Sequence, residues 1–227
     1  MKYLLLSAIL SFNANAVLID DFDTGVGFVA DGTTDGFAVS GFMDGVGIIG
    51  GQRDVSVELL TNPFGSGSAE ITVNSGFFSA NTPSGATGRF IIQWDGDDAG
   101  SSVFNPAGLG SVDFLASSSA LAIDLAFSDL GSMFELLICT NGGLSCDVSS
   151  FDFLGFPGGG TRIISWDDAE FDGLDFSDVS AFQATIIGDT SFDLSIDAVA
   201  TTEVAEPNTL ALMGMSLLLL ARRLRKK

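Results

Sequence analysis

Carboxylates are the residues most able to do chemistry in this chain. Its 227 residues include 29 Asp and Glu and no His. The lack of His excludes Ser-His-Asp and Cys-His catalysis, His-ligated zinc and His-based pH switching. Two opposed carboxylates can hydrolyse a glycoside without His, but no single pair stands out among so many acids. We therefore predict no catalytic residue and a protein that is not an enzyme.

Aspartates at the two ends of the central region are candidate calcium ligands. Asp20, Asp21 and Asp23 fall in one strand-like run, so Asp21 and Asp23 share a face while Asp20 points away. If Asp197 lies beside them on a neighbouring strand, three hard oxygen ligands converge, as calcium prefers. The alternative is a set of solvated carboxylates at a sheet edge. Structural Ca2+ bound by Asp21, Asp23 and Asp197 is the single cofactor that the sequence suggests.

Two other acidic segments have simpler explanations. Residues 95–100 begin like an EF-hand loop, but the fifth and twelfth positions are Ala99 and Pro106, so we expect no EF-hand. The acids within residues 167–172 are expected to form a solvated loop.

Aromatic and cationic side chains are candidate ligand contacts. Trp94 and Trp166 each end a strand-like run and precede an Asp, so either indole could stack on a sugar ring at a rim. The alternative is that both belong to the core. Arg53, Arg89 and Arg162 are the only bases between Asp20 and Glu206, and we expect each to pair with neighbouring carboxylates.

Two cysteines are separated by a turn signal. Asn141-Gly142-Gly143 lies between the strand-like runs that carry Cys139 and Cys146, which is typical of a hairpin. Cysteines paired across such a turn are close enough to bridge. We predict one structural disulfide.

The charge distribution excludes one class of partner. All 29 acids lie between Asp20 and Glu206, against three arginines and no lysine. Such a surface repels phosphate backbones, so we expect no nucleic-acid binding. Divalent cations and neutral sugars remain as partners.

Short alternating runs must position these residues. Runs such as residues 54–60, 88–94 and 120–127 alternate apolar and polar residues, and Gly-rich turns separate them. This pattern over residues 17–203 predicts an all-β domain, a two-sheet antiparallel β-sandwich. A β-helix is the alternative, and the lack of a short repeat counts against it.

The two ends differ from this domain. Residues 1–16 combine Lys2, an apolar run and small residues at Ala14 and Ala16, which is typical of a signal peptide cleaved after Ala16 by signal peptidase. Residues 204–227 hold a Glu-Pro motif, the apolar residues 210–221 and a basic end. The residues that define this tail are Glu206, Pro207, Arg222, Arg223, Arg225, Lys226 and Lys227.

This tail resembles the PEP-CTERM sorting signal of Gram-negative bacteria, which exosortase recognises. Ala205 stands where the usual first Pro would be. The resemblance implies export through the inner membrane and transient membrane contact through a hydrophobic C-terminal helix. Processing by an exosortase-type enzyme and release to the cell surface or the extracellular space would follow. A plain C-terminal membrane anchor is the alternative.

The central region resembles a second family. Residues 17–23 and 192–199 look like the first and last strands of galactose-binding-like jelly rolls, a fold of carbohydrate-binding modules. In many such modules acids near these strands hold structural calcium. Residues 50–54 (GGQRD) and 94–96 (WDG) are similar to patterns common in exported proteins with this sorting tail.

These observations lead to three hypotheses about function. The first is a non-catalytic, exported surface or extracellular-matrix protein associated with extracellular polysaccharide. The second is a carbohydrate-binding module with a defined glycan ligand, which requires an exposed Trp94 or Trp166 over a groove. The third is a carboxylate-dependent glycoside hydrolase, which requires a cleft with two opposed carboxylates.

Overall fold

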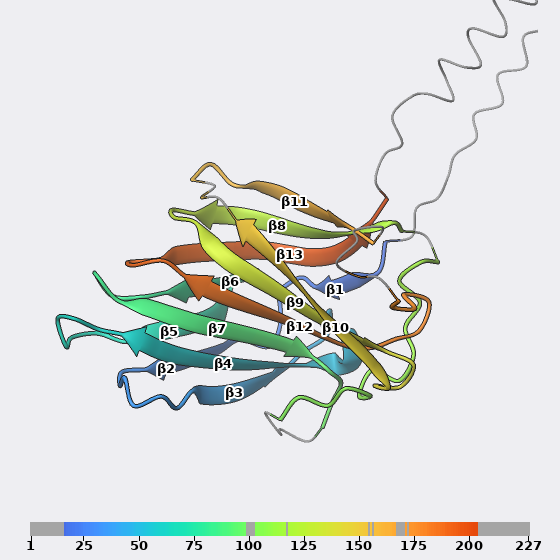
Figure 1. The fold of residues 1–227 in the computed structure, drawn as a ribbon, viewed down its shortest axis with the longest axis horizontal. Helices are drawn as coiled ribbons and strands as arrows, with labels where there is room; N and C mark the ends of the chain where they lie inside the picture. The colour runs from blue at the N-terminus through green and yellow to red at the C-terminus, as the bar shows by residue number, and fades with distance from the viewer. Residues whose placement is uncertain are drawn as a thin grey trace, which may run out of the picture.

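The computed structural model describes residues 16–98, 103–116, 118–153, 155, 157–166, 171 and 173–203. These residues form two antiparallel sheets packed face to face (Figure 1), so the predicted two-sheet antiparallel β-sandwich is confirmed. The seven-stranded sheet has the order β11-β8-β13-β6-β5-β2, with β1 also paired to β13. Its strands are β1 (Leu18–Asp20), β2 (Gly27–Asp31), β5 (Ala69–Asn74), β6 (Phe77–Asn81), β8 (Ala120–Ser128), β11 (Gly160–Ser165) and β13 (Asp193–Thr202).

The second sheet has six strands in the order β10-β9-β12-β7-β4-β3. Its strands are β3 (Val39–Asp44), β4 (Gln52–Thr61), β7 (Thr87–Trp94), β9 (Ser132–Thr140), β10 (Ser145–Phe153) and β12 (Val179–Gly188). A short 3-10 turn, η1 (Ile49–Gly51), leads into β4. In Figure 1 the six-stranded sheet faces the viewer.

Alternation along the strands produces the core between the sheets. On β4, Val55, Val57 and Leu59 are buried, whereas Ser56 and Glu58 between them are only partly buried. Odd and even positions of a strand point to opposite faces, so the aliphatic and Phe side chains of both sheets meet inside. The period-2 pattern that predicted this strand therefore corresponds to side chains that alternate between the core and the outer face.

The chain ends bear on the predicted localisation. In the part of the chain that the structure describes, no helix is long and apolar enough to cross a membrane. This finding contradicts the predicted localisation, in which a C-terminal helix holds the protein transiently in the inner membrane. A span needs about 20 apolar residues, more than the apolar run at 210–221 provides. The predicted sorting tail (204–227) and residues 1–15 of the predicted signal peptide lie outside the described residues.

Candidate functional site

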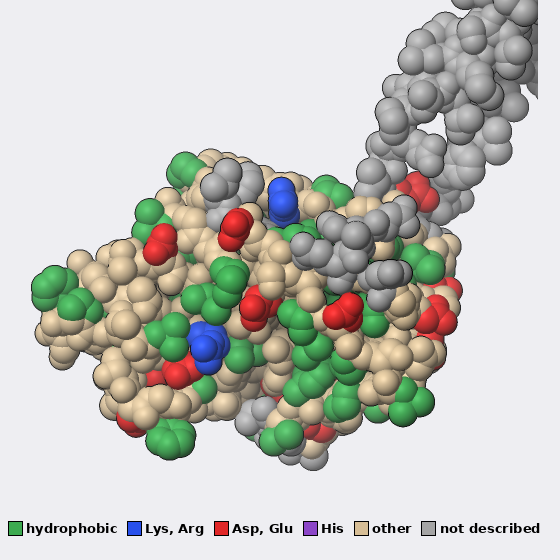
Figure 2. Space-filling model, in the orientation of Figure 1, with side chains coloured by type: hydrophobic (Ala, Val, Ile, Leu, Met, Phe, Trp, Pro, Cys, Tyr) green, Lys and Arg blue, Asp and Glu red, His purple; other side chains and the backbone are tan. Residues whose placement is uncertain are grey.

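The outer face of the six-stranded sheet carries rows of side chains that the strand register brings into line. Side chains directly opposite each other on neighbouring antiparallel strands are in contact distance. Figure 2 shows this face: acidic and hydrophobic side chains are interspersed over it and basic ones are sparse. Two of the rows hold the polar groups best placed to meet a ligand.

The first of these, the Arg89 row, crosses five strands. Its members, from β4 to β10, are Glu58, Arg89, Ile187, Met133 and Asp152. Arg89 donates from Nη1 to Glu58 Oε2 at 2.8 Å, and the Arg89 side chain is 42% exposed. The guanidinium is therefore held in place by one carboxylate while it still faces solvent.

An open hollow of about 420 Å³ lies at this end of the face. Its lining includes three members of the Arg89 row. The lining residues are Gly131, Ser132, Met133, Asp152, Ile187, Gly188 and Asp189. The small residues at positions 131, 132 and 188 make room, and two carboxylates stand beside two apolar side chains.

The second row lies further along the same face and crosses all six strands. Its members are Phe42, Asp54, Gln93, Gln183, Leu137 and Val148. Gln93 donates from Nε2 to Gln183 Oε1 at 2.8 Å, and Gln183 donates from Nε2 to Thr185 Oγ1 at 3.2 Å. These bonds hold two planar amides in fixed orientations at the middle of the sheet.

A group of polar residues lies at the edge of this second row, and we call it the Asp54 cluster. It consists of Asp44, Gln52, Asp54, Asp95 and Asp98. Gln52, Asp54 and Asp95 are buried, Asp98 is partly buried and Asp44 is exposed. Burial, and then the charges of Asp95, Asp98 and Asp44, raise the pKa of Asp54 to about 7. Burial also raises the pKa of Asp95, although a hydrogen bond from the Asn105 backbone N–H opposes the rise.

Behind this cluster, on the inner face, Asp20 forms an ion pair with Arg53. Arg53 Nε lies 2.9 Å from Asp20 Oδ2, and both side chains are fully buried. Trp94 Nε1–H donates to the same Asp20 oxygen at 2.8 Å, and Arg53 Nη2 donates to the Thr24 carbonyl oxygen at 2.7 Å. The GGQRD and WDG segments therefore meet around one carboxylate. No signal in the sequence indicated this role of Asp20, because its partners Arg53 and Trp94 lie far from it along the chain.

The structure corrects the role expected for the two tryptophans. Trp94 is 1% exposed and stacks on Phe182, with ring centroids 5.2 Å apart. Trp166 is 7% exposed and stacks on Phe114 and Phe176. Neither indole offers a ring face to a sugar. Both are core residues, which was the stated alternative, because each lies at an inward-facing position of the sandwich.

The predicted calcium ligands do not converge. Asp21 Oδ1 accepts a hydrogen bond from the Asp23 backbone N–H at 3.1 Å, while Asp23 and Asp197 are exposed. The pairing of β1 with β13 shifts register between Leu18 and Asp20, so the alternation expected for this strand fails and Asp20 turns inward. Throughout the described ranges, no group of three or more His, Cys, Asp or Glu is arranged to hold a metal ion.

Two other predictions concern the pairing of the arginines with carboxylates and the acidic loop after Trp166. Arg53 and Arg89 pair with carboxylates, as expected. The acids of the predicted solvated loop, Asp167, Asp168, Glu170 and Asp172, lie outside the described residues.

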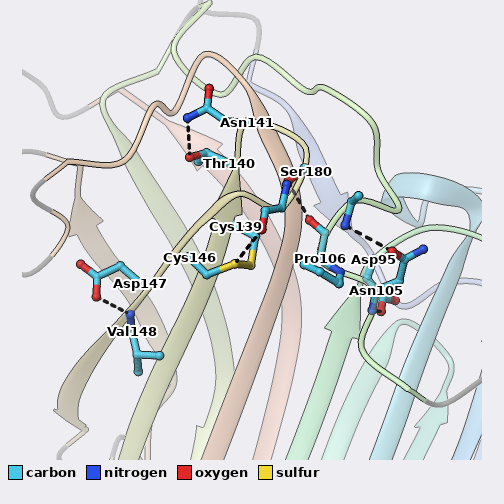
Figure 3. The surroundings of a disulfide bond; sticks show 12 residues. Asp95, Asn105, Pro106, Cys139, Thr140, Asn141, Cys146, Asp147, Val148 and Ser180 are labelled. Atoms are coloured by element: carbon cyan, nitrogen blue, oxygen red, sulfur yellow. Dashed lines mark hydrogen bonds between the residues drawn. A yellow bond between two sulfur atoms is a disulfide. The ribbon is translucent and has the colours of Figure 1, made fainter.

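The predicted disulfide is present. Cys139 and Cys146 lie directly opposite each other on β9 and β10, with their Cα atoms 4.1 Å apart. Asn141, Gly142 and Gly143 in the turn between them have positive φ, which Asn and Gly adopt most readily. Figure 3 shows that the bridge lies next to the loop at Pro106, whose carbonyl oxygen accepts a hydrogen bond from Ser180 Oγ at 2.7 Å.

Comparison with known proteins gives similar folds only. No protein-family model matches the chain, and no match was found among curated proteins. The family 11 carbohydrate-binding module of a cellulosomal cellulase of Clostridium thermocellum is 10% identical, with a TM-score of 0.42 over 86% of this chain and 99% of that one. The Clostridium thermocellum family 11 module in complex with a β-1,3-1,4-mixed-linked tetrasaccharide is 10% identical, with a TM-score of 0.41 over 85% and 98%. An exo-β-agarase is 13% identical, with a TM-score of 0.38 over 85% of this chain and 25% of that one.

Proposed function

We propose that this domain binds a neutral polysaccharide, without cleaving it, at the Arg89 row and the adjoining hollow. The observation that carries the proposal is the apolar floor of Ile187 and Met133 in register between charged groups, Arg89 on one side and Asp152 on the other. Ligand sites combine apolar walls with a few fixed polar groups. A sugar ring has the matching surface, with C–H groups on its faces and hydroxyls around its rim.

The polar groups around the hollow suit hydroxyl partners. Asp152 and Asp189 line it, and a carboxylate accepts hydrogen bonds from hydroxyls. Arg89 supplies N–H donors to hydroxyl oxygens, and its bond to Glu58 fixes the plane of the guanidinium. Arg89 would therefore need little further ordering on binding, which lowers the entropic cost of association.

The charge of the domain argues for a neutral ligand. Acids outnumber bases by 29 to three between Asp20 and Glu206. A sulfated or carboxylated polysaccharide would meet repulsion over most of this surface. Uncharged glycans avoid that penalty, so we assign the ligand to this class.

The positions of the acids with a raised pKa support binding without hydrolysis, because these acids do not line the hollow. A general acid at neutral pH needs a raised pKa together with access to the glycosidic oxygen. Asp20, Asp54 and Asp95, whose pKa values are raised, are at most 1% exposed. Burial and the charge of Asp129 also raise the pKa of the exposed Asp193, but neither Asp193 nor the three buried acids line the hollow. We therefore expect no reducing ends to form when the domain is incubated with its ligand, and their formation would overturn this part of the proposal.

Affinity electrophoresis through a panel of soluble neutral polysaccharides tests the binding. We expect retardation in at least one gel, and a loss of about tenfold in affinity in Arg89→Ala. Arg162→Ala is the control, because it removes the same charge from β11 of the other sheet. A panel without any retardation, or retardation that Arg89→Ala leaves unchanged, would overturn the assignment.

We further propose that the tail is processed as an exosortase-type sorting signal. Glu206, Pro207 and the basic end support this proposal, and they belong to the sequence alone. Intact-mass measurement of the protein from its native host shows whether the chain ends before Arg222. A chain that always retains Arg222 would contradict processing.

A further inference from the structure

The Asp54 cluster contains buried oxygen atoms without hydrogen-bond partners. Within the part of the chain that the structure describes, these atoms are Gln52 Oε1, Asp54 Oδ1, Asp54 Oδ2, Asp95 Oδ1 and Asp98 Oδ1. The side chains of Gln52, Asp54 and Asp95 are 2%, 1% and 1% exposed. An unpartnered amide oxygen therefore accompanies the unpartnered carboxylate oxygens.

Burying carboxylates in this way is costly unless something neutralises them. An unpaired buried charge costs several kcal/mol, as an order of magnitude, relative to the hydrated one. Arg53 precedes Asp54 directly, but strand alternation places the guanidinium on the inner face, where Asp20 pairs with it. The charge of the cluster is therefore not balanced by the nearest arginine.

We propose that Asp54 and Asp95, together with the amide oxygen of Gln52, bind a calcium ion. Gln52 and Asp54 are two residues apart on β4, so they face the same side of the sheet. Asp95 directly follows the end of β7, the strand that pairs with β4. Register thus brings the three donor side chains to one corner of the outer face.

The donor chemistry selects the class of ion. Carboxylate and amide oxygens are hard ligands that suit calcium or magnesium. The described residues supply no set of three acids for a metal, so water and carbonyl oxygens would complete the shell. Calcium accepts six to eight oxygen ligands in irregular geometry, whereas magnesium demands a near-octahedral arrangement. This irregular, largely protein-enclosed corner suits calcium better.

The ion would fasten the loop after β7 onto the sheet. Asp95 already accepts a hydrogen bond from the Asn105 backbone N–H at 2.6 Å, and the Leu109 backbone N–H donates to the Ser180 carbonyl oxygen at 2.9 Å. The loop lies against the disulfide end of the face (Figure 3). Calcium bound between β4 and Asp95 would hold the beginning of this loop. None of the three proposed ligands lines the hollow proposed for the glycan, so the two proposals are independent.

Calcium binding to the EDTA-treated protein, followed by calorimetry and thermal unfolding, tests the proposal. We expect about one calcium per chain and a melting temperature raised more by CaCl2 than by MgCl2 or NaCl at equal ionic strength. Asp54→Asn and Asp95→Asn should abolish the excess response. The control variants Asp35→Asn and Asp197→Asn should keep the excess response to calcium. Asp197 is included because the sequence predicted it as a calcium ligand together with Asp21 and Asp23.

Two further measurements keep the outcome decisive. Circular dichroism in EDTA checks folding, because Asp54→Asn keeps the side-chain shape and should fold without calcium. Terbium luminescence needs no variant: Trp94 directly precedes Asp95, so bound terbium should emit on indole excitation, and calcium should quench this emission by competition. A calcium response no larger than that of NaCl, or one that survives Asp54→Asn, would overturn the proposal.

Discussion

Arg53 and Asp20 form a fully buried ion pair, with Arg53 Nε 2.9 Å from Asp20 Oδ2, that joins the two sheets of the sandwich. Asp20 ends β1 of the seven-stranded sheet, and Arg53 lies on β4 of the six-stranded sheet. Trp94 on β7 donates to the same carboxylate. One carboxylate thus connects three strands that are far apart in the sequence.

Removing this carboxylate charge should destabilise the domain strongly. Asp20→Asn leaves Arg53 buried without its ion-pair partner, which costs about 3–5 kcal/mol in the free energy of unfolding. Urea unfolding measures the change. Glu58→Gln, at the partly exposed pair with Arg89, is the control and should cost less than about 1 kcal/mol. Equal costs for both variants would contradict the role assigned to Asp20.

Replacing both members of the pair should restore part of the loss. The double variant Asp20→Asn with Arg53→Met removes the orphaned charge and keeps an oxygen that can accept from Trp94 Nε1–H. A buried ion pair is often replaceable by uncharged residues at little net cost. We therefore expect the double variant to be more stable than Asp20→Asn alone, again by urea unfolding. A double variant that is less stable would show that Arg53 stabilises the fold through its other contacts.

The disulfide should contribute measurably to stability. Cys139 and Cys146 close a short loop with a sequence separation of 7, which in the chain-entropy model corresponds to about 2–3 kcal/mol. Reduction with a phosphine should lower the free energy of urea unfolding by this amount. Ellman titration of the denatured, unreduced protein should detect no free thiol. Two free thiols in that titration would contradict the bridge.

Trp94 should matter for stability and not for ligand binding. Trp94→Phe removes the Nε1–H bond to Asp20 and leaves space beside Phe182, so we expect a loss of about 1–3 kcal/mol. Affinity for a polysaccharide that the wild type binds should stay within about twofold. A selective loss of affinity with unchanged unfolding would show that Trp94 contacts the ligand.

The apolar floor of the hollow should be required for binding. Ile187→Ser replaces a branched apolar side chain with a small polar one and removes the surface on which we place a sugar ring, so we expect at least about a fivefold loss of affinity. Ile163→Ser is the matched control, because Ile163 is 43% exposed on β11 of the other sheet. Both variants are compared by affinity electrophoresis after thermal unfolding has confirmed their folding. Equal losses in the two variants would remove the hollow from the binding site.

Local patterns in the sequence determined the architecture of the domain and its covalent link. Alternation over residues 54–60 and 88–94 places apolar side chains on one face of β4 and β7, because neighbouring residues of a strand face opposite ways. The turn between Cys139 and Cys146 brings the two thiols together over a separation of 7 residues. Both inferences depend on short-range geometry, which a sequence displays directly.

Only the tertiary structure decided which polar side chains lie in contact with one another. Asp20 and Trp94 are 74 positions apart and bond to each other, while Asp54 and Arg89 take their neighbours from the register of β4 and β7. A register shift in β1 turned Asp20 inward and left Asp21 outside the core. Strand order and register depend on packing between distant segments, and a shift by one residue exchanges the two faces. The alternation of the sequence shows where strands form, whereas the contacts between strands choose the residues that meet at a site.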